Sequence, residues 1–284
     1  MKYIKLFENF EDYDPYELII LPPNKKGEML VGELKKDEPN LNLVRDLIEL
    51  GSNLDWREED GFTALHWCAS RNHQEIARML IDAGADVNIQ DESDVNIKID
   101  GWTALLLCAY YNRPEIARML IDAGADLNIE DEDGSTALHF CARENHTEIA
   151  RMLIDAGADL NIQENHGSTA LHWCARLNHP EIARMLIDAG ADVNIQDNDG
   201  WTALHYCVSY NHTEIARMLI DAGADLNVQN NYGQTALHVC AFKNHPEIAR
   251  MLIDAGADKT IPNNDGKLPY ELARTEELKE LLKP

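Results

Sequence analysis

Histidine and cysteine are the side chains here whose types and numbers could do chemistry, because both bind metal ions and both act in catalysis. The chain of 284 residues contains eleven histidines and six cysteines. His66 and Cys68 stand two residues apart in a stretch with helical character. Side chains at that spacing point to different faces of a helix, so these two cannot hold one ion together. We therefore expect no metal site and no cofactor.

Other catalytic patterns are also missing from the sequence. No Ser/His/Asp set, phosphate-binding glycine loop or paired metal carboxylate stands apart from the repeating unit of the chain. The Asp-x-Asn sequences do not follow the spacing of a calcium loop. His166 is the one histidine outside two recurring sets, and we expect it to be a surface residue. The sequence therefore predicts a protein that is not an enzyme.

The cysteines repeat with the chain. Each lies seven residues after a repeated glycine, at Cys68, Cys108, Cys141, Cys174, Cys207 and Cys240. Equivalent residues of stacked helices lie roughly 8–10 Å apart, beyond the about 7 Å at which a disulfide becomes impossible without backbone movement. We therefore expect small buried thiols in a reducing compartment.

These residues are positioned by one stretch, Glu-Ile-Ala-Arg-Met-Leu-Ile-Asp-Ala-Gly-Ala-Asp, which occurs six times unchanged. The copies begin at Glu75, Glu115, Glu148, Glu181, Glu214 and Glu247. The first two starts are 40 residues apart and all later ones 33, a period that indicates a stack of repeats. The apolar positions recur at helical spacing, and a helix this short must bury them against neighbours. The repeat favours one elongated body over two domains.

Each unit also predicts a first helix before the repeated stretch. Thr63 is a suitable N-cap for it, and Asn72 suits the left-handed residue at its end. In three units a proline opens the second helix, at Pro114, Pro180 and Pro246. After Gly84, which ends the second helix, the chain leads into the next unit as an extended finger.

These motifs resemble the ankyrin-repeat family. The family's Gly-x-Thr-Pro-Leu-His opening matches Thr63 to His66, with alanine in place of proline, and its Gly-His between helices appears as Asn72-His73. Its Gly-Ala-Asp-Val-Asn ending corresponds to Gly84 to Asn88. The resemblance implies an all-α solenoid of helix-turn-helix repeats with β-hairpin or finger loops, about six full repeats plus N- and C-terminal capping units. It also implies that the first histidine ties its helix to the neighbouring loop, and that the second belongs to the turn between helices.

Domain boundaries follow from the repeat. We predict a non-repeat N-terminal arm (1–28), a degenerate N-terminal capping repeat (29–60), six ankyrin repeats (61–262) with a finger insertion at 91–99, and a C-terminal capping repeat (263–284). Within the arm, Pro22 and Pro23 are expected to exclude a helix and to hold residues 18–24 extended.

Charge and hydropathy limit the partners. The formal net charge is −25, and an acidic surface disfavours nucleic acids and anionic membranes. No apolar run approaches the roughly 18 residues of a membrane span, and the first residues lack the features of a secretory signal. We predict a soluble, monomeric, cytoplasmic protein that binds a folded partner protein as an adaptor or inhibitor.

Differences between the units indicate where such a partner would bind. The second helix does not vary; the variation lies just after the turn glycine and at the end of the first helix. In ankyrin proteins both places line the concave face, and Trp, Tyr and Arg dominate interface hot spots. The predicted partner-binding residues are Phe62, Trp102, Tyr110, Tyr111, Arg143, Glu144, Trp201, Tyr210 and Phe242. The alternative is drift between recent duplicates, but drift alone would not so readily place large aromatic side chains at positions that we predict to be exposed.

Other aromatic side chains and the insertion complete this prediction. The residues after the first histidine are expected to pack in the core or between repeats: Trp67, Phe140, Trp173 and Tyr206. The insertion at 91–99 and the divergent unit after it favour residues 62–113 as the primary contact. The competing interpretation is that a finger tolerates insertion cheaply, because loop entropy grows slowly with length.

Two alternative functions remain open. The charge of −25 suits an acidic mimic that blocks a DNA- or RNA-binding protein, although acidic fingers also keep a repetitive protein soluble. The leucine-to-asparagine spacing resembles that of sites modified by the ankyrin-directed asparaginyl hydroxylase. The candidate asparagines are Asn88, Asn128, Asn161, Asn194 and Asn227.

Overall fold

The computed structural model describes residues 18–91 and 101–284, and within these ranges the chain forms helices and turns without strands. It falls into two compact units, residues 1–126 (unit 1) and 127–284 (unit 2). The sequence repeat favours one elongated body instead. None of the helices in the described ranges has the length and apolar character needed to cross a membrane.

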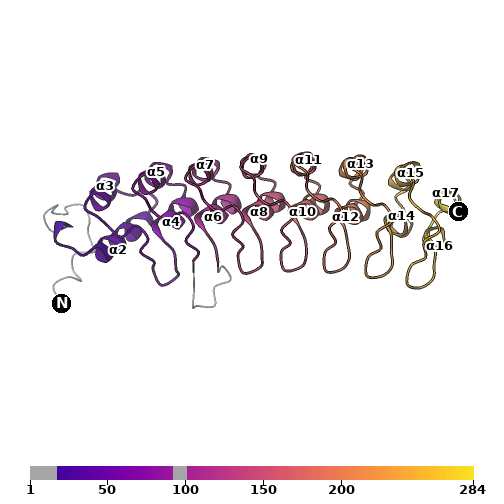
Figure 1. The fold of residues 1–284 in the computed structure, drawn as a ribbon, viewed down its shortest axis with the longest axis horizontal. Coiled ribbons are helices and arrows are strands. Elements are labelled where there is room, and N and C mark those ends of the chain that lie inside the picture. The colour runs from indigo at the N-terminus through magenta and orange to yellow at the C-terminus, as the bar shows by residue number, and fades with distance from the viewer. Residues whose placement is uncertain (1–17, 92–100) are drawn as a thin grey trace. The chain divides into compact units, whose positions relative to one another are not determined.

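Within the described residues, unit 1 contains three pairs of helices. They are α2 (Pro23–Leu34) with α3 (Leu41–Glu49), α4 (Ala64–Arg71) with α5 (Gln74–Asp82), and α6 (Ala104–Tyr111) with α7 (Pro114–Asp122). The first helices of the pairs pack in one row, with α4 against α2 and α6, and the second helices pack in another, with α5 against α3 and α7 (Figure 1).

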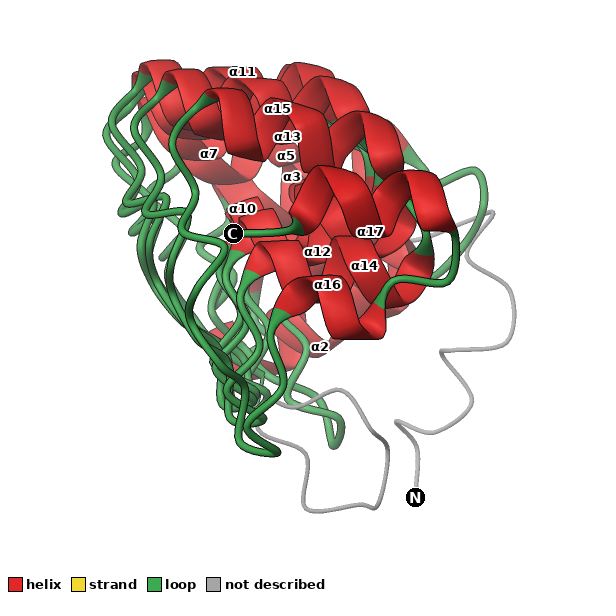
Figure 2. Cartoon of the chain, turned by 90° about the vertical axis from the view of Figure 1, so that its right-hand side faces the viewer, coloured by secondary structure: helices red, strands yellow, loops and turns green. Residues whose placement is uncertain are grey.

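Unit 2 continues the same pattern. Its helices are α8 (Ala137–Glu144), α9 (Thr147–Asp155), α10 (Ala170–Leu177), α11 (Pro180–Asp188), α12 (Ala203–Tyr210), α13 (Thr213–Asp221), α14 (Ala236–Lys243), α15 (Pro246–Asp254), α16 (Pro269–Leu272) and α17 (Glu276–Leu282). The first helices α8, α10, α12, α14 and α16 pack in sequence, and so do the second helices α9, α11, α13 and α15. Within the unit, the fingers all project from one side of the helices (Figures 1 and 2).

The ends of the first helices form as predicted. Thr63 and His66 make a capping box at the start of α4. The Thr63 side chain accepts a hydrogen bond from the His66 backbone N–H, and the His66 side chain accepts one from the Thr63 backbone N–H. The six asparagines that end these helices have positive φ angles between 56° and 63°, the left-handed conformation. Proline opens α7, α11 and α15, as expected for a position whose N–H has no partner within the helix.

Burial explains why the unit repeats so strictly. In α9, Ile149, Ala150 and Leu153 are buried, and the same three positions are buried in every other copy. Burying an isoleucine or leucine side chain contributes about 1.5–3 kcal/mol, so each short helix is stabilised mainly by its neighbours. The six cysteines are buried and free, as predicted, and burial raises the pKa of five of their thiols.

The predicted extended segment at residues 18–24 is wrong. Helix α2 begins at Pro23 and crosses the predicted boundary between residues 28 and 29. Pro22 is the extended N-cap residue, and Pro23 occupies the first helical turn, where its missing N–H costs nothing. Two consecutive prolines therefore start this helix, and α2 packs on α3 and α4 as the first helix of the N-terminal cap.

Candidate partner-binding surface

Histidines of the first set connect a repeat to the following one, as the resemblance implied, and the repeat with Leu106 lacks this histidine. His66 Nδ1 accepts a hydrogen bond from the Thr63 backbone N–H (3.1 Å), and His66 Nε2 lies 2.9 Å from the Trp102 carbonyl oxygen. Equivalent bonds to the following finger are made by His139, His172, His205 and His238. Burial lowers the pKa of His66 to about 4. These side chains are therefore neutral structural elements at pH 7.

Histidines of the second set connect a repeat to the preceding one. His212 Nδ1 lies 2.8 Å from the Ala175 carbonyl oxygen, and His245 Nδ1 lies 2.7 Å from that of Val208. His166 lies outside both sets and is exposed, and its Nδ1 is 3.0 Å from Glu164. Across residues 18–91 and 101–284, no three His, Cys, Asp or Glu side chains form a group suited to a metal ion.

The fingers position the residues that follow the turn glycine. In unit 2, Asp197 Oδ1 accepts hydrogen bonds from the backbone N–H groups of Asp199 (3.0 Å) and Trp201 (2.8 Å). Asp91 does the same for Trp102 in unit 1 (2.5 Å), and its own N–H donates to the Trp102 carbonyl (2.9 Å). Asp91 and Trp102 are therefore joined by two hydrogen bonds. Residues 92–100, which hold most of the predicted insertion, lie outside the described residues.

The aromatic side chains after the turn glycine are more buried than predicted. Trp102 is only 8% exposed, and Phe62 and Trp201 are half-buried. The Trp102 ring meets Tyr110 at 5.3 Å, and the Trp201 ring lies 5.1 Å from Tyr206. The prediction of an exposed Trp102 is wrong, because the finger folds this position back onto the first helix of its own unit.

Unit 1 brings several predicted residues together at the end of α6. Tyr110 and Tyr111 are exposed, and their rings lie 5.0 Å apart at nearly a right angle. The Arg113 guanidinium lies 5.9 Å from the centre of the Tyr111 ring. These side chains form an aromatic cluster at the end of α6, and the buried Trp102 ring contacts Tyr110.

A second cluster in unit 1 surrounds Trp67. Its Nε1 donates to Glu58 (2.6 Å), and Lys35 and Arg71 lie 5.3 and 5.7 Å from its ring. Phe62 contacts the same ring at 5.6 Å. Trp67 is half-buried, which agrees in part with the expected packing between repeats.

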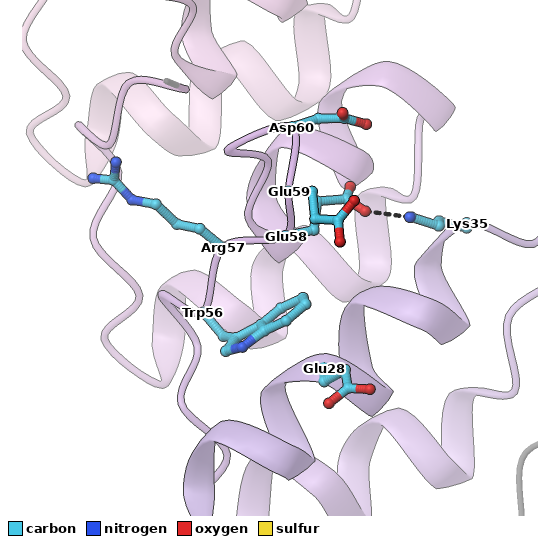
Figure 3. Close-up of a pocket in the computed structure, with 7 residues that line it drawn as sticks. All are labelled: Glu28, Lys35, Trp56, Arg57, Glu58, Glu59 and Asp60. Carbon is cyan, nitrogen blue, oxygen red and sulfur yellow. Dashed lines mark hydrogen bonds and ion pairs between the residues drawn. The ribbon is translucent and has the colours of Figure 1, made fainter. Parts of the chain in front are cut away.

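A pocket of about 690 Å³ adjoins this cluster. It is lined by Glu28, Lys35, Trp56, Arg57, Glu58, Glu59 and Asp60, and Lys35 pairs with Glu58 there (Figure 3). Sequence analysis missed it because the N-terminal cap matches the repeat only in its second helix. No short motif marks the residues that line it.

Unit 2 carries a row of arginines stacked on aromatic rings. Arg143 lies 4.8 Å from the centre of the buried Phe140 ring, and Arg143 and Arg176 lie 6.0 and 5.4 Å from that of Trp173. Glu144, also predicted as a contact, is exposed and pairs with Arg143 at 3.2 Å. Phe140 and Trp173 thus pack as expected, and their rings also contact the guanidinium groups of Arg143 and Arg176.

The ends of α12 and α14 are the most exposed apolar part of this row. Tyr210 is 51% and Phe242 49% exposed, as predicted for both. Arg274 lies 4.8 Å from the Phe242 ring centre. Leu177 at the end of α10 is also exposed, and neither Leu177 nor Arg274 is among the predicted partner-binding residues. Leu177 could have been found, because it occupies the position equivalent to Tyr210.

The five candidate modification residues share one structural role. Each asparagine Oδ1 accepts a hydrogen bond from the backbone N–H of an aspartate in the next repeat, at 2.7–2.9 Å. In unit 1 Asn88 binds Asp126, and in unit 2 Asn128 binds Asp159. Asn161, Asn194 and Asn227 do the same for Asp192, Asp225 and Asp258.

Comparison with known proteins identifies similarities over most of the chain. The family described as ankyrin repeats (3 copies) matches residues 35–131, 105–197 and 186–263. The crystal structure of the ankyrin repeat domain of Bcl-3, described as a unique member of the IkappaB protein family, has a TM-score of 0.70 and 26% identity. That similarity covers 79% of this chain and 100% of the other. A 54-residue part of the chain (18%) is 43% identical to the palmitoyltransferase AKR1 of Eremothecium gossypii, but the match spans only 8% of that protein.

Proposed function

The chain belongs to the ankyrin-repeat family, and from this premise we propose that it is a non-enzymatic scaffold, an adaptor or inhibitor, that binds a folded partner protein. Ankyrin repeats are protein-interaction modules. The binding surface would be the face formed by the ends of the first helices and the residues after the turn glycine. Buried free thiols suit a reducing compartment such as the cytoplasm, and we propose that the chain acts there as a monomer.

The observation that carries this proposal is the exposure of large apolar side chains at equivalent positions. At the ends of first helices, unit 1 exposes Tyr110 and Tyr111, and unit 2 exposes Leu177, Tyr210 and Phe242. The repeated residues of the second helices bury their large apolar side chains or leave them only partly exposed. Exposed apolar groups that gather on one face mark interaction sites, and tyrosine is enriched among binding hot spots.

The two alternatives have less support. An acidic mimic would present carboxylates on its binding face, whereas the variable ends of the six repeated first helices carry one carboxylate, Glu144, beside four cations: Arg71, Arg143, Arg176 and Lys243. Hydroxylation of the five asparagines remains a separate proposal, compatible with scaffold function. It would add oxygen atoms to side chains that already bond the next unit.

Substitution of the exposed aromatic residues tests the scaffold. The chain serves as bait in extracts of its native cells, and bound proteins are quantified by mass spectrometry. We expect that a variant with Tyr110→Ala, Tyr111→Ala, Tyr210→Ala and Phe242→Ala loses its specific partner at least tenfold, since a single hot spot contributes about 2 kcal/mol. Its thermal unfolding should change little, because these side chains are exposed.

Tyr232→Ala is the matched control. Tyr232 is 65% exposed, but it lies at the tip of a finger and away from the ends of the first helices. It should retain the partner. If the fourfold variant binds the same proteins at the same abundance as the wild type, this face does not bind the partner and the proposal is wrong.

A further inference from the structure

The cations of unit 2 differ in whether a carboxylate lies close to them. On the second helices, Arg151 pairs with Glu181 (3.4 Å) and Arg184 with Glu214 (3.2 Å), whereas Arg217 contacts the Met251 sulfur (3.7 Å). At the end of α8, Arg143 pairs with Glu144 (3.2 Å). At the ends of the first helices and at the C-terminal cap lie Arg176, Lys243 and Arg274, all exposed. Within the described residues, none of these three has a carboxylate oxygen within 4.0 Å.

These three cations flank the exposed apolar side chains. Arg176 and Leu177 are adjacent on α10, Tyr210 ends α12, and Phe242 precedes Lys243 on α14. Arg274 stacks on Phe242 at 4.8 Å. Because α10, α12 and α14 pack side by side, the order along the row is cation, apolar centre, cation.

The stacking keeps the guanidinium groups in fixed positions. Arg176 lies on Trp173 and Arg274 on Phe242, so each loses less side-chain freedom when it binds a ligand. A guanidinium held in this way presents its N–H groups as a planar fork that matches a carboxylate. Lys243 adds a third positive charge beside Phe242.

We infer that this surface of unit 2 binds an acidic segment of a partner protein, with carboxylates at both ends of a short apolar stretch. The carboxylates would bind Arg176 at one end and Lys243 and Arg274 at the other. The apolar side chains would cover Leu177, Tyr210 and Phe242. This inference rests on the proposed scaffold function and specifies the chemistry of its partner.

Two alternative roles for the cations have weaker support. Positive side chains in the last turn stabilise a helix through its dipole, which applies to Arg176 and Lys243. It does not apply to Arg274, which lies between α16 and α17, and it does not explain the exposed apolar residues. A nucleic acid would use the same cations, but it carries a charge on every phosphate, so the net charge of −25 repels it more strongly than a short segment with a few carboxylates.

A peptide library provides the test. The full chain is used to select binders from a displayed library of random twelve-residue peptides. We expect the selected peptides to contain more Asp and Glu than the input library, next to apolar residues. Their affinity should fall as salt concentration rises, because the pairing is electrostatic.

Matched variants locate the binding. The triple variant Arg176→Gln, Lys243→Gln, Arg274→Gln should bind the selected peptides at least tenfold more weakly. The control Arg151→Gln, Arg184→Gln, Arg217→Gln removes the same charge from second helices and should stay within twofold of wild type. Arg176→Lys with Arg274→Lys retains the charge and should give an intermediate affinity. It also tests the surface if the triple variant folds poorly by circular dichroism.

Several outcomes would overturn the inference. Selected peptides without an acidic excess, or equal weakening by the two triple variants, would show that these cations do not select the ligand. A labelled twenty-nucleotide single strand that binds through the same cations, while acidic peptides do not, would reassign the surface to nucleic acid.

The same experiment separates this inference from the scaffold function. If neutral peptides bind and are lost on Tyr210→Ala with Phe242→Ala, the scaffold function stands and only the acidic partner is wrong. If no peptide depends on either set of residues, the acidic segment is wrong, and the bait experiment with the folded partner decides the scaffold function.

Discussion

Each buried histidine of the first helices uses its two ring nitrogens differently. In unit 2, His205 Nδ1 accepts from the Thr202 backbone N–H (3.2 Å), and Nε2 donates to the Gln234 carbonyl oxygen (3.1 Å). A proton on Nδ1 would face the Thr202 N–H donor, and the positive ring would be buried. Burial lowers the pKa of His205 to about 4, so the folded chain favours the neutral ring.

This preference of the folded chain for a neutral His205 ring predicts a pH dependence of stability. The unfolded chain takes up a proton at about pH 6.5, and the folded chain only near pH 4. The stability from His205 is therefore complete above about pH 6.5 and is lost as the pH falls toward 4, by on the order of 3 kcal/mol. His205→Leu, which copies Leu106 of the second full unit, should be less stable at pH 7 and should lose less stability between pH 7 and 5. Urea unfolding at several pH values measures both effects. An unchanged dependence on pH would mean that His205 binds its proton at the same pH in the folded and unfolded chains.

At the scale of elements, the fingers of unit 2 are joined to one another. Asn198 Nδ2 donates to the Asn165 carbonyl (2.9 Å), and its backbone N–H donates to that of His166 (3.0 Å). Asn231 makes the same bond to the Asn198 carbonyl. This close approach depends on the turn glycines: a Cβ at Gly200 would lie 2.8 Å from the Asn231 backbone nitrogen.

Alanine substitutions at two glycines distinguish the destabilising effect of this close contact from that of backbone strain. Gly200 and Gly266 have almost equal φ angles, 77° and 75°, but a Cβ at Gly266 would meet nothing within 4 Å. Alanine should cost about 1–2 kcal/mol at either position through the left-handed backbone, and a further ~1–3 kcal/mol at Gly200 through overpacking. Chemical denaturation of both variants measures the difference. Equal losses would show that the fingers move apart without cost.

The elements were more predictable than their surroundings. Strict repetition predicted the first and second helices, the left-handed asparagines and the buried thiols, because these depend on residues near in sequence. The exposure of Trp102 and the finger-to-finger bonds of Asn198 depend on the packing of adjacent units. The start of α2 was missed because proline signals both the end and the beginning of a helix. Among the predicted site residues, exposure was correct for Tyr110, Tyr111, Glu144, Tyr210 and Phe242.

At the scale of the whole molecule, the dominant feature is the net charge of −25. The ion pairs that oppose it, such as Arg151–Glu181 and Arg184–Glu214, join side chains that are more than half exposed. Exposed pairs contribute little to stability. Repulsion among the carboxylates should therefore exceed the attraction of these pairs, and it is screened by salt.

We therefore predict that the melting temperature rises when sodium chloride is increased from low to physiological concentration, as measured by circular dichroism. Asp155, Asp188 and Asp221 are the last residues of three second helices, and all three are exposed. A negative charge there also opposes the helix dipole. The triple variant Asp155→Asn, Asp188→Asn, Asp221→Asn should melt at a higher temperature than wild type in low salt, and its melting temperature should respond less to added salt. A melting temperature that falls with salt in the wild type would mean that the Arg–Glu pairs outweigh the repulsion, and the variant would then gain nothing.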